Sequence, residues 1–386
     1  MTEADSTPDQ PMISVVIPCL NEAQSVGICV EKALRGIAKT GLTGEVVVVD
    51  NGSTDGSGEI ATAAGARVVL ETRRGYGSAY LRGFEEARGR YFVMGDADDT
   101  YDFEDIERFI RPLHERDVDM VMGSRLKGDI LPGAMPWSHR WIGNPILSGM
   151  LKILFRTTVS DSHCGMRSFT ADAYRRMGLR TTGMEFASEI VVNALRNQLV
   201  IEEIPITYYP RAGESKLESF RDAWRHVRFM LLFSPSHLFL LPSLLLLAGG
   251  GAAILWLGGG PQELFGRTWD FHTLLFGCLA VILGFDLLVF DTLAKRFSIA
   301  AGFVQPGKWL ERRIRFFTLE RGLILGGLVF LAGLGLEAKI ILDWARDGYG
   351  EMMAVRGVVL GMTAMVLGTQ TAFASFLFSL TLIEKR

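Results

Sequence analysis

Two acidic side chains at the end of an apolar run are the clearest candidates for chemistry in this sequence. The run from Tyr91 to Gly95 leads directly into Asp96, Ala97 and Asp98. Two carboxylates separated by one residue at the end of a strand can face a common point and supply hard oxygen ligands to Mg²⁺ or Mn²⁺. A divalent cation stabilises the negative charge that develops on a departing diphosphate. The spacing therefore predicts a metal site at Asp96 and Asp98 that serves a nucleoside diphosphate.

Other polar residues follow apolar runs elsewhere in the first half of the chain. In an open parallel sheet, such residues lie at the carboxyl ends of the strands, where ligands bind. Asp50 closes a run of valines and is placed to accept hydrogen bonds from a base or ribose. The stretch from Gly75 to Gly83 has neither the glycine spacing nor the position of a dinucleotide-binding turn. Its backbone N–H groups can still approach a diphosphate closely.

The pattern around these candidates predicts the fold that must position them. Between residues 13 and 214, short β-branched runs alternate with amphipathic stretches, which is typical of an α/β domain with a mostly parallel sheet. Residues 1–12 are polar and acidic and are expected to form a disordered tail. The strands are expected over 13–18, 45–50, 67–70, 91–95, 118–123 and 201–208.

The character of the chain changes after residue 234, and residues 235–386 are expected to form a transmembrane domain. Four apolar stretches, each near the ~20 residues that a spanning helix needs, cover 238–256, 271–293, 323–342 and 358–383. The connection 295–321 is rich in lysine and arginine, which places it in the cytosol by the positive-inside rule. With four spans, both termini and the α/β domain lie in the cytosol. We therefore expect an integral protein of the cytoplasmic membrane.

A basic amphipathic helix is expected between the two parts, over residues 215–234. Its apolar residues recur at helical spacing and are Leu217, Phe220, Trp224, Val227 and Leu231. The other face carries Arg221, Arg225 and Arg228. This pattern favours a helix on an anionic membrane surface, and the alternative is an ordinary helix packed on the α/β domain. The apolar stretch 141–155 is either a second interfacial element or buried core.

The composition excludes several classes of protein. A chain that is 48% hydrophobic and 22% charged is too apolar for one soluble domain and too charged to lie wholly in lipid. A net charge of -3 gives no bulk signature of nucleic-acid binding. The four cysteines lack CxxC spacing, which argues against a disulfide framework and a zinc site.

Several segments, taken together, resemble the family 2 glycosyltransferases with the GT-A fold. Among these, the resemblance is to polyprenyl-phosphate glycosyltransferases such as the dolichol-phosphate mannose and glucose synthases. It spans about residues 13–234. The motifs that carry it are 13–18 with Asn21 and Glu22, 49–55, 75–83, 96–98, 122–125, 161–169 and 211–216.

The resemblance also implies roles for individual residues. The residues expected to hold the nucleotide sugar are Pro18, Asn21, Glu22, Asp50, Gly52, Gly75, Asp96, Ala97 and Asp98. The catalytic set is expected to be Asp96, Asp98, Arg125, Arg211 and Lys216. Of these, Arg125, Arg211 and Lys216 are expected to contact phosphates of donor or acceptor. The alternative is that they are surface basic residues beside an anionic membrane.

The implied reaction is inverting transfer of a hexose from a nucleoside-diphosphate sugar to a polyprenyl or dolichyl phosphate at the cytosolic membrane face. A phosphate acceptor is already anionic at neutral pH, so the reaction can depend on positioning and charge instead of a general base. The expected partners are therefore a nucleotide sugar, a lipid phosphate and the membrane; nucleic acid is not among them, and a homo-oligomer is left open. The stretch 99–102 departs from the mannose synthases, so their donor specificity cannot be carried over to this chain. UDP-glucose is the favoured donor because 183–189 is similar to glucosyl-type members.

Two other functions are weighed against this one. A processive polysaccharide synthase resembles its relatives in a QxxRW segment, of which only Arg140 and Trp141 are present here. A non-catalytic membrane scaffold predicts erosion of the metal acids, which are intact.

The roles of five further residues are left open. Glu185 and Glu189 either touch the sugar or metal or are helix-surface acids. His139 and His163 flank the expected site without partners at ligand spacing. Asp286, inside the second span, is either functional or a helix-pairing residue.

Overall fold

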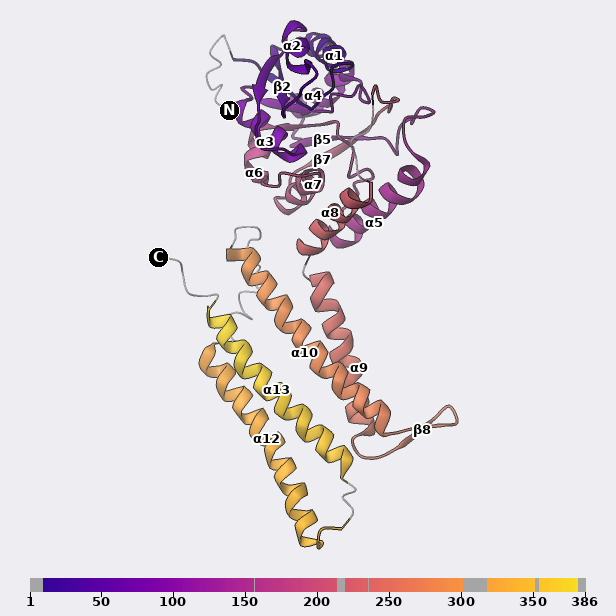
Figure 1. Cartoon of the computed structure of the whole chain (residues 1–386), viewed down its shortest axis with the longest axis vertical. Helices are drawn as coiled ribbons and strands as arrows, with labels where there is room; N and C mark the ends of the chain where they lie inside the picture. Colours follow the sequence, from indigo (N-terminus) through magenta and orange to yellow (C-terminus); the bar gives the residue numbers. More distant parts are fainter. Residues whose placement is uncertain are drawn as a thin grey trace. The chain divides into compact units, whose positions relative to one another are not determined.

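The computed structural model describes residues 10–155, 157–213, 219–234, 236–300, 318–350 and 354–380. The chain divides into two compact units, Met1–Phe233 and Ser234–Arg386 (Figure 1). Each unit has its own packed interior. Lys216 and most of the basic connection 295–321 lie outside the described residues.

The first unit is built on a seven-stranded sheet in the order β3-β2-β1-β4-β6-β5-β7. The strands are β1 Ile13–Cys19, β2 Gly44–Asp50, β3 Arg67–Leu70, β4 Tyr91–Met94, β5 Met120–Ser124, β6 Arg167–Thr170 and β7 Ile201–Pro205. Neighbouring strands are parallel except around β6, which runs antiparallel to both β4 and β5. The expected mostly parallel sheet is thus confirmed.

The β6 strand was not predicted from the sequence. It is only four residues long, and Arg167 and Ser168 are both fully buried, so it lacks the apolar signature of an interior strand. Hydrogen bonds replace that signature, because the Ser168 hydroxyl donates to the carbonyl of Phe109 at 2.9 Å. Of the expected strands, 201–208 was too long: β7 ends at Pro205, and Tyr208 forms only an isolated bridge with Ile130.

Helices cover both faces of this sheet and account for the run of valines in β2. The helices are α1 Val26–Lys39, α2 Ser57–Ala63, α3 Tyr76–Glu86, α4 Ile106–Glu115, α5 Asn144–Phe155, α6 Ala171–Met177, α7 Phe186–Arg196 and α8 Ser219–Leu232. Val46 and Val48 join the core formed with α1 and α4, whereas Val47 and Val49 join the core formed with α3 and α7. Side chains alternate along a strand, so a strand buried on both faces is apolar throughout.

The α8 helix packs onto the α/β unit and also keeps an exposed apolar residue. His226, Phe229 and Met230 are buried in the unit, whereas Trp224 is 56% exposed. The face that packs is different from the apolar face expected from the sequence. The α5 helix is similarly divided, with Leu151 buried and other apolar residues of the helix exposed. Both helices therefore bury part of their apolar surface against the α/β unit, and contact of the exposed part with a membrane stays a prediction.

The second unit contains, among its described residues, four helices long and apolar enough to cross a membrane. They cover Ser236–Leu257, Phe271–Phe297, Leu319–Arg346 and Val355–Leu380. These segments correspond to α9 Leu241–Leu257 with the preceding turn η3 Ser236–Leu240, α10 Phe271–Ala300, α12 Leu319–Arg346 and α13 Val355–Leu380. All four expected spans lie within or largely within them. A hairpin of β8 Gln262–Leu264 and β9 Arg267–Trp269, which was not expected, connects α9 to α10.

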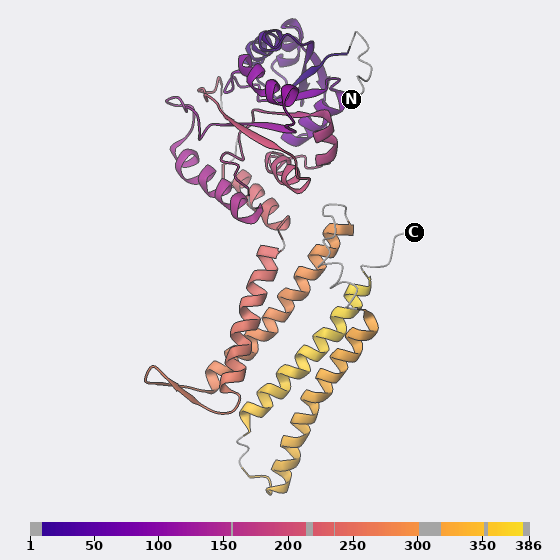
Figure 2. The same cartoon turned by 180° about the vertical axis from the view of Figure 1, so that it is seen from behind.

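Glycines allow the long helices to approach closely. The α12 and α13 helices lie side by side (Figure 2), and a Cβ added at Gly326 would come within 2.6 Å of the carbonyl oxygen of Gly368. Small residues are favoured between membrane helices because close backbone approach maximises van der Waals contact. A polar link joins α13 to α10, since Gln370 Nε2 donates to Asp286 Oδ1 at 2.9 Å. Helix pairing therefore accounts for Asp286, one of the two interpretations left open.

Aromatic side chains gather at the end of the second unit where α9 and α12 finish. Trp256 and Trp269 lie with ring centroids 6.3 Å apart, and Trp344 and Tyr349 lie 4.9 Å apart. Tryptophan and tyrosine are enriched at membrane–water boundaries because their rings are apolar and carry one polar group. This placement supports a bilayer boundary at that end of the helices.

Replacing Gly326 by valine should destabilise the second unit. The new side chain meets the α13 backbone, and overpacking of this kind costs about 1–3 kcal/mol. The adjacent Gly327 is the matched control, because a Cβ there has no neighbour within 4 Å and the change in helix propensity is the same. Thermal unfolding of the full chain in detergent should show a lower midpoint for Gly326→Val than for Gly327→Val. Equal midpoints would contradict this packing.

Candidate functional site

The predicted site residues meet at one edge of the sheet. Strand β1 is paired in parallel with β2 and with β4, so the carboxyl ends of all three strands point the same way. Cys19 lies opposite Asp50 in the register, and Asp96 and Asp98 follow β4. The turns after these strands therefore share a single edge, which is where open α/β sheets bind ligands.

Asp96 is held by two tyrosines from the first turns of α3. Its Oδ1 accepts hydrogen bonds from the hydroxyls of Tyr76 at 3.0 Å and Tyr80 at 3.5 Å. Burial, together with the nearby carboxylate of Asp98, raises the pKa of Asp96 to about 7. A cation at this site therefore has a strong electrostatic effect, because it favours the ionised form that burial disfavours.

Asp98 is fixed by its own turn and by a guanidinium. Its Oδ1 accepts from the Thr100 hydroxyl at 2.6 Å, and its Oδ2 lies 3.1 Å from Nη1 of Arg211. The next residue, Asp99, adopts a positive φ of 60° and pairs with Lys32 Nζ at 2.7 Å. Asp98 therefore cannot rotate freely, and its Oδ2 faces positive charge.

Arg211 connects three segments that are far apart in the sequence. Besides Asp98, its guanidinium forms an ion pair with Glu22, in the turn after β1. The backbone N–H of Ala212 donates to the carbonyl of Asp98 at 3.1 Å. Three predicted site residues, Glu22, Asp98 and Arg211, are therefore in direct contact. Their contact with a nucleotide or phosphate stays a prediction.

The side chains at this edge suit a divalent cation that is coordinated partly by the protein and partly by the phosphates of a substrate. Asp96 and Asp98 each direct Oδ1 to protein hydrogen bonds; Oδ2 of Asp98 faces Arg211, and Oδ2 of Asp96 is left for other partners. Among the described residues no group of three or more His, Cys, Asp or Glu side chains is arranged to hold a metal. Mg²⁺ usually takes one or two carboxylates together with substrate phosphates and water. A pair of aspartates beside a diphosphate matches that ligand set.

The expected nucleotide residues are linked through Asn51, which sequence reasoning passed over. Its Nδ2 donates to the carbonyls of Glu71 and Arg73, both at 2.8 Å, and its Oδ1 accepts from Gly75 N–H at 2.9 Å. Asp50 accepts from the backbone N–H of Ser53 at 2.8 Å. Asn51 thus joins the end of β2 to the glycine-rich turn before α3, and its position beside Asp50 was the available signal.

The other expected nucleotide residues lie at the same edge, and some already have structural roles. Asn21 accepts from Thr54 N–H at 2.8 Å, which ties the turn after β1 to the loop after β2. Gly52 has a φ of 90°, which favours glycine, and a Cβ at Gly75 would clash with the carbonyl of Thr182. Pro18 lies in β1 opposite Val49. Whether these residues touch a donor is a prediction.

Arg125 forms an ion pair with the buried carboxylate of Asp161. Asp161 was not among the functional residues expected from the sequence. The Nε and Nη2 of Arg125 lie 2.7 and 2.8 Å from the two oxygens of Asp161. Burial alone would raise the pKa of Asp161, but the Arg125 guanidinium outweighs burial and holds that pKa below its usual value. The guanidinium also lies over the ring of Tyr208. A phosphate contact by Arg125 would therefore use its remaining nitrogen, Nη1.

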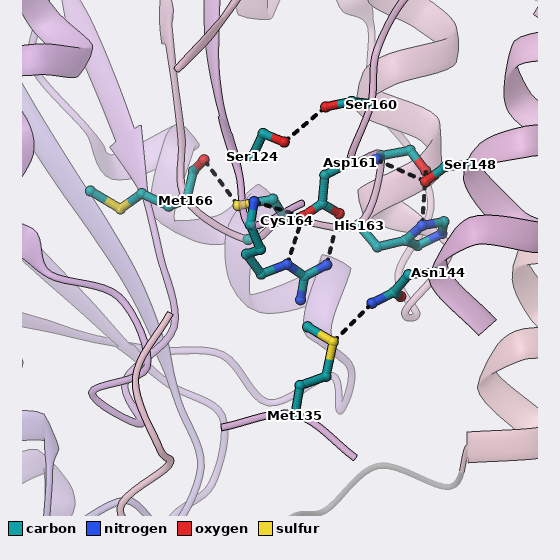
Figure 3. Close-up of polar contacts among 12 residues, drawn as sticks. Ser124, Met135, Asn144, Ser148, Ser160, Asp161, His163, Cys164 and Met166 are labelled. Carbon is teal, nitrogen blue, oxygen red and sulfur yellow. Dashed lines mark hydrogen bonds and ion pairs between the residues drawn. The ribbon is translucent and has the colours of Figure 1, made fainter. Parts of the chain in front are cut away.

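The loop around Asp161 is ordered by several buried polar contacts (Figure 3). Ser124 and Ser160 share a hydrogen bond of 2.8 Å between their hydroxyls. Arg167, which is fully buried, donates to the carbonyls of Ser162, Cys164 and Ala187, each at 2.8 Å. This arginine joins the 161–165 loop to the start of α7. The sequence offered no signal for it beyond its place in a motif.

The two histidines flanking the expected site differ in the structure. His163 packs edge-on against His226 of α8, with ring centroids 4.4 Å apart, and the Ser188 hydroxyl contacts His226 Nδ1 at 2.8 Å. Burial lowers the pKa of His226 to about 4 and that of His163 well below its usual value. Both are neutral at physiological pH, so they join α8 to the loop as packing residues. His139 lies in the short π-helix η2 His139–Gly143.

Glu189 is neither a surface acid nor free to bind a sugar. It is 1% exposed, and its carboxylate accepts from the backbone N–H groups of Arg180 and Thr181 and from the Thr181 hydroxyl. The carbonyl of Thr182 in turn accepts from Ser78 N–H at 3.1 Å. Glu189 therefore holds the 180–182 loop against α3. Glu185 precedes α7 and is half-buried.

Comparison with known proteins places this chain in a family. Residues 14–178 match the glycosyl transferase family 2 model, and residues 292–382 match the family 2 C-terminal transmembrane region. The low-salt glycan biosynthesis hexosyltransferase Agl6 of Haloferax volcanii is 42% identical over 369 residues, covering 95% of this chain and 88% of Agl6. The chain belongs to glycosyltransferase family 2. It is therefore an enzyme with a GT-A domain and an integral membrane part.

Other similar proteins cover a smaller share of the chain. The glycosyltransferase AglJ of Haloferax volcanii is 32% identical over 220 residues, covering 56% of this chain and 69% of AglJ. Glucosyl-3-phosphoglycerate synthase from Mycobacterium tuberculosis, solved in complex with Mn²⁺, UDP and glucosyl-3-phosphoglycerate, is 20% identical. It covers 57% of this chain and 79% of its own, with a TM-score of 0.46.

Replacing Glu189 by glutamine should loosen the family 2 domain beside the glycine-rich turn. The amide keeps one acceptor oxygen and introduces an NH₂ group that faces the N–H groups of residues 180 and 181. We expect a loss of about 1–3 kcal/mol, because buried donors lose their partner. Glu185→Gln is the matched control for stability. A midpoint of thermal unfolding as high for Glu189→Gln as for the control would contradict this role.

Stability should fall in mildly acidic solution because of the histidine pair. The folded-state pKa of His226 is about 4, below the ~6.5 of an unfolded chain, so the unfolded chain binds more protons below pH ~6.5. Stability is then lost between pH ~6.5 and ~4, by about 2 kcal/mol from His226 at pH 5. His226→Asn should flatten the pH dependence of the thermal midpoint. The exposed His114→Gln should leave it steep, and an unchanged slope in His226→Asn would contradict the assignment.

Proposed function

We propose that this protein transfers a hexose, glucose from UDP-glucose in the first instance, to a polyprenyl phosphate at the cytosolic face of the membrane, with inversion at the anomeric carbon. The observation that carries the proposal is a pair of aspartates at the sheet edge, Asp96 and Asp98, with the guanidinium of Arg211 against Asp98. Asp96 and Asp98 suit a divalent cation that would accompany the leaving diphosphate, and Arg211 suits an anion. A site with both kinds of charge fits a reaction in which two phosphorylated partners meet.

The side chains around the acids support a mechanism based on charge and position. A divalent cation between Asp96 and Asp98 would neutralise charge on the departing diphosphate. Tyr76 and Tyr80 fix Asp96, and Thr100 fixes Asp98, so little rearrangement is needed during the reaction. The lipid phosphate needs no general base, because it is anionic before it attacks.

The assignment of the sugar has two supports. The relative that covers nearly the whole chain, Agl6, is named as a hexosyltransferase of glycan biosynthesis, which favours a hexose over other donors. The stretch 183–189 resembles glucosyl-type members, which favours glucose among hexoses. The loop 180–182 just before it is held against α3 by Glu189, so this stretch begins beside the glycine-rich turn.

The lipid acceptor is supported by the architecture of the chain. Four spanning helices follow the family 2 domain directly, which provides a permanent bilayer contact for a lipid substrate. Exposed Trp141 and Trp224, and the basic face of α8, suit a membrane surface. Lysine and arginine are concentrated in 295–321, which supports a cytosolic side for this connection and for the family 2 domain.

Incubating the purified full chain with UDP- and GDP-sugars, Mg²⁺ or Mn²⁺ and a polyprenyl phosphate should yield a glycolipid, with UDP-glucose the best donor. Asp98→Asn should lower turnover by about 100-fold or more, because a charge-stabilising ligand is lost. Asp129→Asn makes the same chemical change at an exposed residue and should retain activity. No glycolipid with any donor would reject the proposed reaction, and full activity in Asp98→Asn would move the metal site elsewhere.

A further inference from the structure

The guanidinium of Arg211 lies inside the acidic site that is proposed to receive a cation. Its Nη1 is 3.1 Å from Oδ2 of Asp98, and its Nη2 forms an ion pair with Glu22. The side chains of Arg211, Glu22 and Asp98 are 22%, 11% and 10% exposed. Charges withdrawn from water interact more strongly than surface pairs. Arg211 is therefore a strongly held counter-ion for Asp98.

Arg211 provides a positive partner for Asp98 and Glu22, but not all of its own N–H groups have a hydrogen-bond acceptor within the described residues. Its Nε is buried and has no hydrogen-bond partner within the part of the chain that the structure describes. Buried polar groups in native proteins nearly always have a partner, so an unsatisfied N–H in a binding site points to a ligand oxygen. A guanidinium pairs well with phosphate, which can accept two parallel hydrogen bonds.

The same carboxylate oxygen serves both the arginine and the proposed cation. Oδ1 of Asp98 is engaged by Thr100, so only Oδ2 is directed to other charges, and Arg211 lies against it. A guanidinium and a divalent cation that share one carboxylate oxygen are close together and repel each other. The arginine therefore weakens the binding of a cation to Asp98, and a bound cation weakens the attraction of Asp98 for the arginine.

The backbone on both sides of Arg211 is held by hydrogen bonds. Movement of the Arg211 side chain alone is therefore enough to take the guanidinium away from Asp98. Tyr209 N–H donates to the carbonyl of Thr100 at 3.0 Å, and Ala212 N–H donates to that of Asp98 at 3.1 Å. These bonds hold residues 209–212 next to the acidic turn. Rotation about the bonds of a long, flexible side chain can then carry the guanidinium from Asp98 to a neighbouring anion.

We propose that Arg211 neutralises Asp98 in the free enzyme and moves onto the diphosphate when the nucleotide sugar binds. This inference rests on the proposed function, because it takes Asp96 and Asp98 as cation ligands and a nucleoside diphosphate as donor. Its consequence is that the cation alone binds weakly and that cation and nucleotide strengthen each other's binding. Such coupling is reciprocal, and coupling of this kind typically changes affinities by about 5- to 150-fold.

The test is the affinity of the full chain in detergent for Mn²⁺ alone and then with UDP, measured by electron paramagnetic resonance of free Mn²⁺. In the unaltered protein, UDP should tighten Mn²⁺ binding at least about tenfold. Arg211→Ala and Arg211→Gln should bind Mn²⁺ alone about tenfold more tightly, because the competing charge is gone, and should gain less from UDP. Arg211→Lys keeps the charge and should bind Mn²⁺ alone as weakly as the unaltered protein.

Two controls separate the possible failures. Arg116→Ala removes the same charge from an exposed pair with Glu202 and should leave Mn²⁺ affinity unchanged. Asp98→Asn should abolish tight Mn²⁺ binding with or without UDP. If Asp98→Asn loses Mn²⁺ but Arg211→Ala binds it no more tightly than the unaltered protein, the exchange is wrong and the proposed metal site stands. If Asp98→Asn keeps its Mn²⁺ affinity, the metal site itself is wrong, and the exchange fails with it.

Discussion

The acidic edge of the sheet exists because β1 is paired in parallel with β2 on one side and with β4 on the other. Parallel pairing sends all three carboxyl ends in one direction, so the turns that carry Glu22, Asp50 and Asp96 must share a small space. Negative charge gathered in this way needs compensation. Arg211 from a distant segment, the tyrosine hydroxyls on Asp96 and the Lys32 pair with Asp99 all provide it.

A second group of buried polar residues holds the rest of the family 2 domain around this edge. Arg125 with Asp161, Arg167 with three carbonyls, and Glu189 with the 180–182 loop each place a charged group in the interior with several hydrogen-bond partners. Such groups are costly to bury, and their value lies in fixing loops that apolar packing alone would leave loose. Two of the loops that they fix lie at the sheet edge, 161–165 against Asp96 and 180–182 against Gly75.

The sequence predicted individual candidates better than it predicted their relations. Asp96 and Asp98 could be recognised as candidate metal ligands because their pattern, a strand followed by two acids one residue apart, lies within a few consecutive residues. The pair of Glu22 with Arg211 could not, because these residues are 189 positions apart and only folding brings them together. His226 as the neighbour of His163, and Asn51 as the link to Gly75, were missed for the same reason. The β6 strand was missed because its buried positions are polar.

By itself, the sequence determined the division into an α/β part and four apolar helices, the acidic turn, and the resemblance to family 2. These features depend on hydrophobic periodicity, helix length and short motifs, all of which are local properties of the chain. Only the tertiary structure decided which carboxylate faces which cation, that Glu189 is a structural acid and that α8 packs with a face other than the one expected. Those outcomes depend on contacts between distant residues, whose energies are set by burial and geometry once the chain has folded.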